Sequence, residues 1–242
     1  VLIRGVGRSC SYWLEFREHL ERERRVLVLD NRGIGRSDTP PLPWGTAAMA
    51  DDVAEVLIDS GVQRADVFGI SLGGMIAQRL ALRHPHRVRR LVLACTTAGG
   101  RAAARIPLPA AAALARAAAM PYDEAIRYSA PWVLSPAHLE RRPEIVDVWI
   151  AIAASEPKSR RGLIGQLMAA ASHDASAGLR LVEHDTLVFT GDRDRVVPPV
   201  NSERLAALLP RSTRRTVGGA GHDVPTERPE ETAELVLGFL TR

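Results

Sequence analysis

The chain has 242 residues, of which 46% are hydrophobic and 25% charged, values typical of one globular domain with room for an inserted subdomain. No run approaches 18 uncharged apolar residues, so neither a transmembrane helix nor a membrane partner is predicted. The net charge is +4, but Lys158 is the only lysine among 32 basic residues and the arginines form no basic block, which argues against nucleic-acid binding.

Short apolar runs alternate with amphipathic stretches through the first hundred residues. Strands are predicted at Val1–Ile3, Val26–Leu29, Asp66–Ile70 and Leu91–Ala94, and helices over about 12–23, 49–60 and 72–84. Such alternation is typical of βαβ units, which build a parallel sheet covered by helices on both faces.

The pattern changes in the middle of the chain. From about Ala98 to Arg180 the sequence is rich in alanine and helical in period, without a convincing strand. The alternation then resumes with strands at Thr186–Thr190 and Thr213–Val217 and helices over about 199–209 and 229–240. We therefore predict an α/β core made of residues 1–98 and 181–242, interrupted by a helical cap over 99–180.

The two cysteines, Cys10 and Cys95, are expected to be buried free thiols, because two cysteines make no disulfide framework. No group of cysteines and histidines has the spacing of zinc ligands, so no metal is predicted.

The first residues already read as a strand. Val1 is not preceded by a methionine, and we expect residues to be missing before it, which leaves a signal peptide open. We expect a cytoplasmic protein, and nothing in the sequence indicates an oligomeric state.

The stretch Gly69-Ile70-Ser71-Leu72-Gly73 fits the G-x-S-x-G pattern, in which a sharp strand-to-helix turn presents a serine. The pattern alone also describes a glycine-rich turn with a serine at a helix N-cap. Here it follows a predicted strand and opens a predicted helix. A serine hydroxyl becomes a nucleophile only beside a base, usually histidine, which in turn needs an orienting carboxylate.

Both further groups occur downstream in the required context. Asp192 and Asp194 lie in "TGDRDRVVPP" after one predicted strand, and His222 lies in "GGAGHDVP" after the next. Singly, these are ordinary loop residues. In the order Ser, Asp, His, with each one beyond a strand end, they predict a catalytic triad with Ser71 as the nucleophile.

Five stretches together resemble the α/β-hydrolase fold superfamily, closest to enol-lactone hydrolases, esterases and cofactor-free haloperoxidases. They are "RGVGRSCSYW", "DNRGIGRSD", "GISLGG", "GDRDRVVP" and "GAGHDVPTERPEE". The resemblance covers nearly all of the chain except the insertion. It implies a mostly parallel α/β-hydrolase sheet, Asp194 as the triad acid, and no metal or organic cofactor. Two departures are Arg4, where relatives usually carry histidine, and the absence of the two strands that usually precede Val1.

The resemblance implies a hydrolase of small-molecule esters or lactones. Ser71 attacks the carbonyl, His222 takes its proton, and the backbone N–H groups of Val6 and Leu72 bind the oxyanion. Haloperoxidase or perhydrolase activity uses the same triad and is the alternative, and a non-catalytic binding protein on this fold is another.

Three residues are expected to bind substrate. Arg4 lies one residue before the oxyanion glycine and would grip a carboxylate of an anionic substrate, or else pair with an acid beneath the loop. Trp132 and Trp149 belong to the predicted cap and would form an apolar pocket wall, or else the core of the cap.

Overall fold

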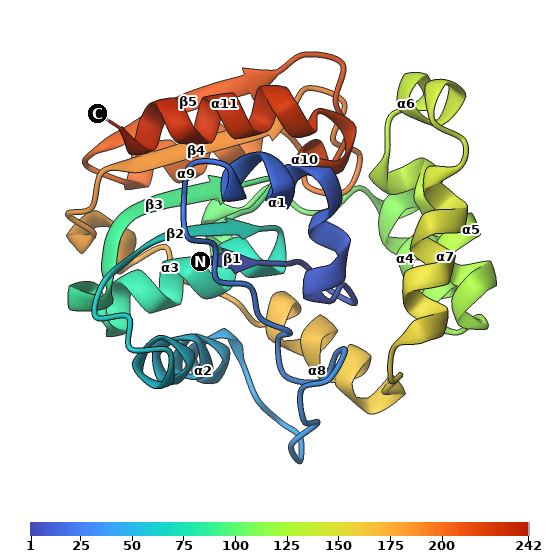
Figure 1. Cartoon of the computed structure of the whole chain (residues 1–242), viewed down its shortest axis with the longest axis horizontal. Helices are drawn as coiled ribbons and strands as arrows, with labels where there is room; N and C mark the ends of the chain where they lie inside the picture. The colour runs from blue at the N-terminus through green and yellow to red at the C-terminus, as the bar shows by residue number, and fades with distance from the viewer. Residues whose placement is uncertain (242) are drawn as a thin grey trace.

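A five-stranded parallel sheet forms the centre of the computed structural model, which describes residues 1–241 (Figure 1). Its strands are β1 (Leu2–Ile3), β2 (Ala65–Ile70), β3 (Val88–Ala94), β4 (Thr186–Gly191) and β5 (Ser212–Val217). They lie side by side in chain order, and each neighbouring pair is parallel. The mostly parallel sheet predicted from the sequence is confirmed.

One predicted strand is wrong. Val26–Leu29 forms no strand and makes only an isolated bridge from Val28 to Leu2, together with a 2.9 Å hydrogen bond from Leu2 N to Leu27 O. Its neighbour β1 is only two residues long and pairs with β2 on its other side, and Val28 meets a single residue of it, Leu2.

The apolar runs are continuous because the strands are covered on both faces. In β3, Leu91 and Leu93 point into one hydrophobic cluster, while Val92 and Ala94 point into the other. The first cluster packs beneath α2 (Thr46–Asp59), α3 (Leu72–Arg83) and α9 (Val200–Leu208), and the second beneath α1 (Leu14–Glu21) and α11 (Pro229–Leu240).

The middle of the chain is helical. It contains α4 (Leu108–Ala118), α5 (Tyr122–Val133), α6 (Pro136–Arg141), α7 (Ile145–Ser155) and α8 (Arg160–Ala171). Helices α4 to α7 stand beside the sheet, whereas α8 runs back beneath it (Figure 1). A Cβ on Gly162 of α8 would lie 2.0 Å from the carbonyl oxygen of Gly33, so α8 packs directly on a core loop. The division into core and cap at residues 98 and 181 stays a prediction.

Nowhere in residues 1–241 does a helix have the length and apolarity needed to cross a bilayer.

A buried histidine joins the end of the helical segment to the core. The His173 ring contacts Thr46 Oγ1 through Nδ1 at 2.9 Å and Gln78 Oε1 through Nε2 at 3.4 Å. Burial lowers the pKa of His173 from 6.5 to about 3. The folded state therefore holds this ring neutral in acid that would protonate it in the unfolded chain.

This shift predicts a loss of stability in mild acid. Below about pH 6.5 the unfolded chain binds a proton at His173 that the folded state rejects until about pH 3. The free energy of unfolding should then fall by up to about 1.4 kcal/mol per pH unit across that window. We expect His173→Gln to fall less steeply than wild type when urea unfolding is followed from pH 7 to pH 4. Parallel curves for the two proteins would contradict the assignment.

Candidate active site

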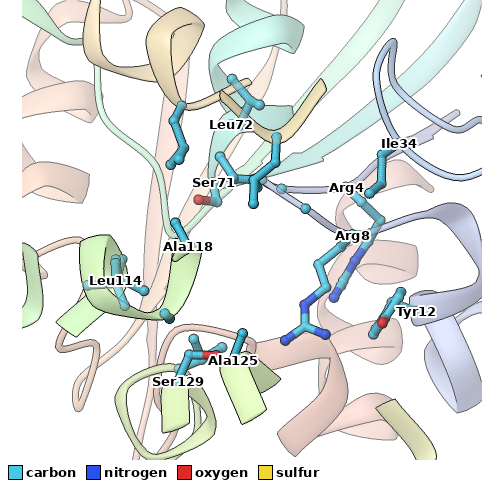
Figure 2. A pocket seen from close by; sticks show the side chains of 18 of the residues that line it. Arg4, Arg8, Tyr12, Ile34, Ser71, Leu72, Leu114, Ala118, Ala125 and Ser129 are labelled. Carbon is cyan, nitrogen blue, oxygen red and sulfur yellow. The ribbon is translucent and has the colours of Figure 1, made fainter. Parts of the chain in front are cut away.

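Ser71 occupies a sharp turn between β2 and α3. Its backbone has φ 56° and ψ −122°, a region that a residue with a side chain rarely adopts. The turn is held by Ser71 N donating to Ala94 O at 3.0 Å and by Thr96 Oγ1 donating to Ser71 O at 2.7 Å. These contacts hold the serine at the carboxyl end of β2, where its side chain faces a cavity (Figure 2).

Glycines around Ser71 allow the turn to be this tight. A Cβ on Gly73 would lie 2.0 Å from Ile3 O, and one on Gly69 would lie 2.2 Å from Gly73 O. A Cβ on Gly74 would lie 2.6 Å from Thr96 Cγ2. Any side chain at these positions would push the helix away from the strands, so the glycines are required by close backbone contact.

His222 and Asp194 lie together after β5 and β4. His222 Nδ1 and Asp194 Oδ2 are 2.8 Å apart, and both side chains are buried. The other carboxylate oxygen, Asp194 Oδ1, accepts hydrogen bonds from Val196 N at 2.9 Å and Val197 N at 2.8 Å. Asp192 instead accepts from Gly219 N at 2.7 Å, and its side chain is 43% exposed. The geometry therefore pairs His222 with Asp194.

The electrostatics of this pair favour an imidazolium. Burial by itself lowers the pKa of His222, but the charge of Asp194 and the hydrogen bond to it outweigh burial and raise that pKa above its ordinary value. A neighbouring carboxylate of this kind stabilises the protonated form of a histidine that accepts a proton from a serine.

The histidine loop is fastened to the end of α5. Val133 O accepts from His222 N at 2.8 Å, and Glu227 Oε1 accepts from Gly221 N at 2.8 Å and from Ser135 N at 3.0 Å. Sequence analysis missed Glu227, a buried carboxylate whose only sequence signal was its position in the histidine-loop motif.

A cavity of about 300 Å³ contains both Ser71 and His222 in its lining. Much of its wall is apolar and comes from the inserted segment, including Ile126 and Leu163. Leu114, Ala118 and Ala125 of the same segment are seen in Figure 2. The helices of the predicted cap thus line the same cavity as the serine.

Two backbone N–H groups beside Ser71 are free to bind an oxyanion. Val6 and Leu72 line the cavity, and neither N–H donates to a protein acceptor within residues 1–241. Leu72 N opens α3, where N–H groups lack intrahelical partners. Gly5 brings the other loop close, since a Cβ there would lie 3.1 Å from Ser71 Cβ and 3.5 Å from Ser71 Oγ.

The guanidinium of Arg4 is already occupied, which corrects the expectation that it grips a substrate. Its Nη1 and Nη2 donate to Asp223 Oδ1 and Oδ2 at 3.1 and 2.7 Å. Both side chains are buried, at 2% and 4% exposure, and Arg4 also stacks on Trp13 at 4.7 Å. Burial raises the pKa of Asp223, but Arg4 outweighs this and holds it below its ordinary value. Both outer nitrogens of the Arg4 guanidinium are therefore used within the protein.

Neither Trp132 nor Trp149 lines the cavity, which corrects the expectation that they form its wall. Trp149 is fully buried in a cluster with Tyr12 and Ile126, and its carbonyl accepts from Tyr12 Oη at 3.0 Å. Trp132 is partly buried and stacks beneath Arg195 at 4.3 Å. Trp149 packs between α7 and α5, whereas Trp132 does not belong to that cluster, and the sequence period did not show which way each side chain faces.

Arg8 is a cavity residue that sequence analysis missed. It lies in the oxyanion-loop motif "RGVGRSCSYW", and its guanidinium stacks 4.4 Å from the ring of Tyr12 and 4.1 Å from that of Trp149. The motif contains two arginines, and nothing in its sequence distinguishes the one that pairs with a distant acid from the one that reaches the cavity.

Cys95, Asp194 and His222 are the one group in the described chain, residues 1–241, whose ligand atoms lie close enough for a metal, within 4.8 Å of one another. Asp194 and His222 already bond each other, and burial raises the pKa of the Cys95 thiol well above its ordinary value. A protonated thiol beside an occupied pair does not fit a metal site.

The fold and this site define a class of protein. Residues 1–229 match the family model for the alpha/beta hydrolase fold, and the chain belongs to that family and is a hydrolase.

Named relatives agree with this class. The chain is 28% identical to the 2-hydroxymuconate semialdehyde hydrolase of Pseudomonas sp. (strain CF600), over 99% of this chain and 86% of that one. Among solved structures, a hydrolase from Pseudomonas aeruginosa PA01 is 33% identical with a TM-score of 0.85, covering 100% of this chain and 89% of that one. A malate-bound thermophilic esterase from Thermogutta terrifontis is 26% identical with a TM-score of 0.84, covering 99% and 88%.

Proposed function

We propose that the chain is a serine hydrolase that cleaves a carboxylic ester or lactone through Ser71, His222 and Asp194. Ser71 Oγ attacks the carbonyl carbon while His222 accepts the hydroxyl proton, and Asp194 holds the imidazole in the correct tautomer. The oxyanion is bound by the N–H groups of Leu72 and Val6, each worth roughly 3 to 4 kcal/mol in the transition state.

The intermediate is an acyl-enzyme. His222 returns its proton to the leaving alkoxide as the carbon–oxygen bond breaks. A water molecule then attacks the acyl-enzyme carbonyl, with His222 again as the base, and releases the acid and free Ser71.

One observation carries this proposal. Ser71, with its strained backbone, lines the same cavity as His222, and Nδ1 of His222 is hydrogen-bonded to the buried Asp194. The apolar wall suits an acyl chain. The similarity to an esterase supports ester chemistry.

A fluorophosphonate should attach covalently to Ser71 and to no other serine, because only a serine with a base reacts at a useful rate. Intact mass and peptide mapping would be compared for wild type, Ser71→Ala and Ser129→Ala. Ser129 lines the same cavity without a histidine partner among its hydrogen bonds and serves as the matched control.

We expect one adduct on wild type and Ser129→Ala and none on Ser71→Ala. An adduct that persists in Ser71→Ala would overturn the proposal. A panel of p-nitrophenyl esters, lactones and thioesters, repeated with hydrogen peroxide as acceptor, would then separate hydrolysis from perhydrolysis.

A further inference from the structure

Arg8 reaches into the cavity from the loop that carries the oxyanion residue Val6. Its backbone N–H donates to Gly5 O at 3.4 Å, which fixes the loop beside Ser71. Figure 2 shows the Arg8 side chain extending into the cavity near Tyr12. The centroids of the Tyr12 and Trp149 rings lie 4.4 and 4.1 Å from the central carbon of the guanidinium. Contacts of this kind are cation–π contacts, and a guanidinium carries five N–H donors.

The acids that line the cavity have other partners. Asp223 is held by both outer nitrogens of Arg4, and Glu156 Oε1 accepts from Ser9 Oγ at 2.8 Å and Ser11 Oγ at 2.6 Å. Among the ion pairs of residues 1–241, Arg8 has no carboxylate partner, and the side chain that interacts with its guanidinium as a hydrogen-bond partner is the neutral Tyr12.

Arg8 is therefore a cation without a counter-ion in a largely apolar cavity. Burial lowers the pKa of Arg8, while the neighbouring Tyr12 and Asp223 raise it. Because the ordinary pKa of a guanidinium lies far above neutrality, the side chain stays protonated. A partly buried charge of this kind is stabilised by an anion that enters the cavity.

We propose that Arg8 binds a carboxylate of the substrate, so that the preferred ester or lactone carries an ionised carboxyl group beyond the bond that is cleaved. The inference rests on the proposed function and names its substrate class. The guanidinium fork matches a carboxylate with two parallel hydrogen bonds.

The charge balance of the cavity favours a monoanion. Its ionised lining groups are three cations, Arg4, Arg8 and Lys158, and two anions, Asp223 and Glu156. Arg4 and Asp223 neutralise each other, which leaves Arg8 and Lys158 against Glu156, a net charge of +1. One carboxylate restores neutrality, whereas a doubly charged phosphate would exceed it.

The test compares charged and neutral substrates in matched pairs. p-Nitrophenyl half-esters of C4 to C8 diacids place the carboxylate on the acyl side, and the butyrate ester of 3-hydroxybenzoate places it on the leaving group. Each is paired with its neutral methyl-ester counterpart. The proteins are wild type, Arg8→Gln, Arg8→Lys and Arg116→Gln. Arg116 is the control, an exposed arginine that also stacks on a tyrosine, Tyr128, at 5.3 Å but outside the cavity lining.

In at least one carboxylate series, Arg8→Gln should lower kcat/KM for the charged substrate about 10- to 100-fold and for its neutral partner less than about 3-fold. Arg8→Lys should keep part of the preference, and Arg116→Gln all of it. Equal losses for charged and neutral substrates in both series would overturn the inference. The rate of fluorophosphonate labelling reports whether each Arg8 variant keeps an intact site.

A second measurement separates this inference from the proposed function. Adipate should raise the melting temperature of Ser71→Ala, and the added Arg8→Gln change should abolish the rise. If Ser71 takes no fluorophosphonate but adipate protects through Arg8, the proposed function fails and the inference stands. If Ser71 is labelled and Arg8 distinguishes neither substrates nor adipate, the inference alone fails.

Discussion

Replacing Asp194 with asparagine is expected to lower kcat for ester hydrolysis by about four orders of magnitude. The carboxylate accepts from His222 Nδ1 at 2.8 Å, and this bond sets which ring nitrogen is free to take the serine proton. An asparagine amide can present its NH2 group to Nδ1, which favours the wrong tautomer and removes the charge that stabilises the imidazolium. Steady-state rates on the best p-nitrophenyl ester measure the effect.

Asp192→Asn is the matched control for this change. Asp192 lies in the same loop, but its carboxylate is largely solvated and accepts from the backbone of Gly219. This variant should keep most of the wild-type kcat. A large loss of kcat in Asp192→Asn with little loss in Asp194→Asn would assign the acid of the proposed triad to Asp192 and contradict the hydrogen-bond geometry.

Replacing Asp223 with alanine is expected to lower the free energy of unfolding by about 3 to 5 kcal/mol. The change leaves the guanidinium of Arg4, which is 2% exposed, as an unpaired charge in the interior. Urea unfolding at pH 7 measures this cost directly. Activity is a poor measure here, because Asp223 is adjacent to His222 and changes at this position affect both properties.

A double variant separates the loss of the pair from the loss of one partner. Arg4→Met combined with Asp223→Leu replaces both charges by apolar groups of similar length and should recover most of the stability lost in Asp223→Ala. If Asp223→Ala costs less than about 1 kcal/mol, the pair is not the buried ion pair that the geometry indicates.

The features that sequence by itself determined are those that depend on local geometry. The glycines around Ser71 are readable because a tight strand-to-helix turn leaves no space for a Cβ, as the 2.0 Å approach of Gly73 to Ile3 O shows. The strands β2 to β4 are readable because both of their faces are covered, so that their residues are apolar over several successive positions, whereas β5, with the sequence STRRTV, is an edge strand that is largely exposed. The sequence also predicts that Ser71, Asp194 and His222 lie near one another, because each follows a strand and parallel strands bring their carboxyl ends to one edge of the sheet.

Tertiary structure decided every feature that depends on a distant partner. Arg4 and Asp223 are 219 residues apart, and no local pattern showed that the acid next to His222 would pair with the guanidinium. The free cation of the cavity is consequently Arg8, four residues further along the same loop. Val26–Leu29 has the composition of a strand, but a strand also needs a neighbour long enough to pair with, and β1 has only two residues. Trp149 is buried against Tyr12 and Ile126, a contact between segments that only the folded chain brings together.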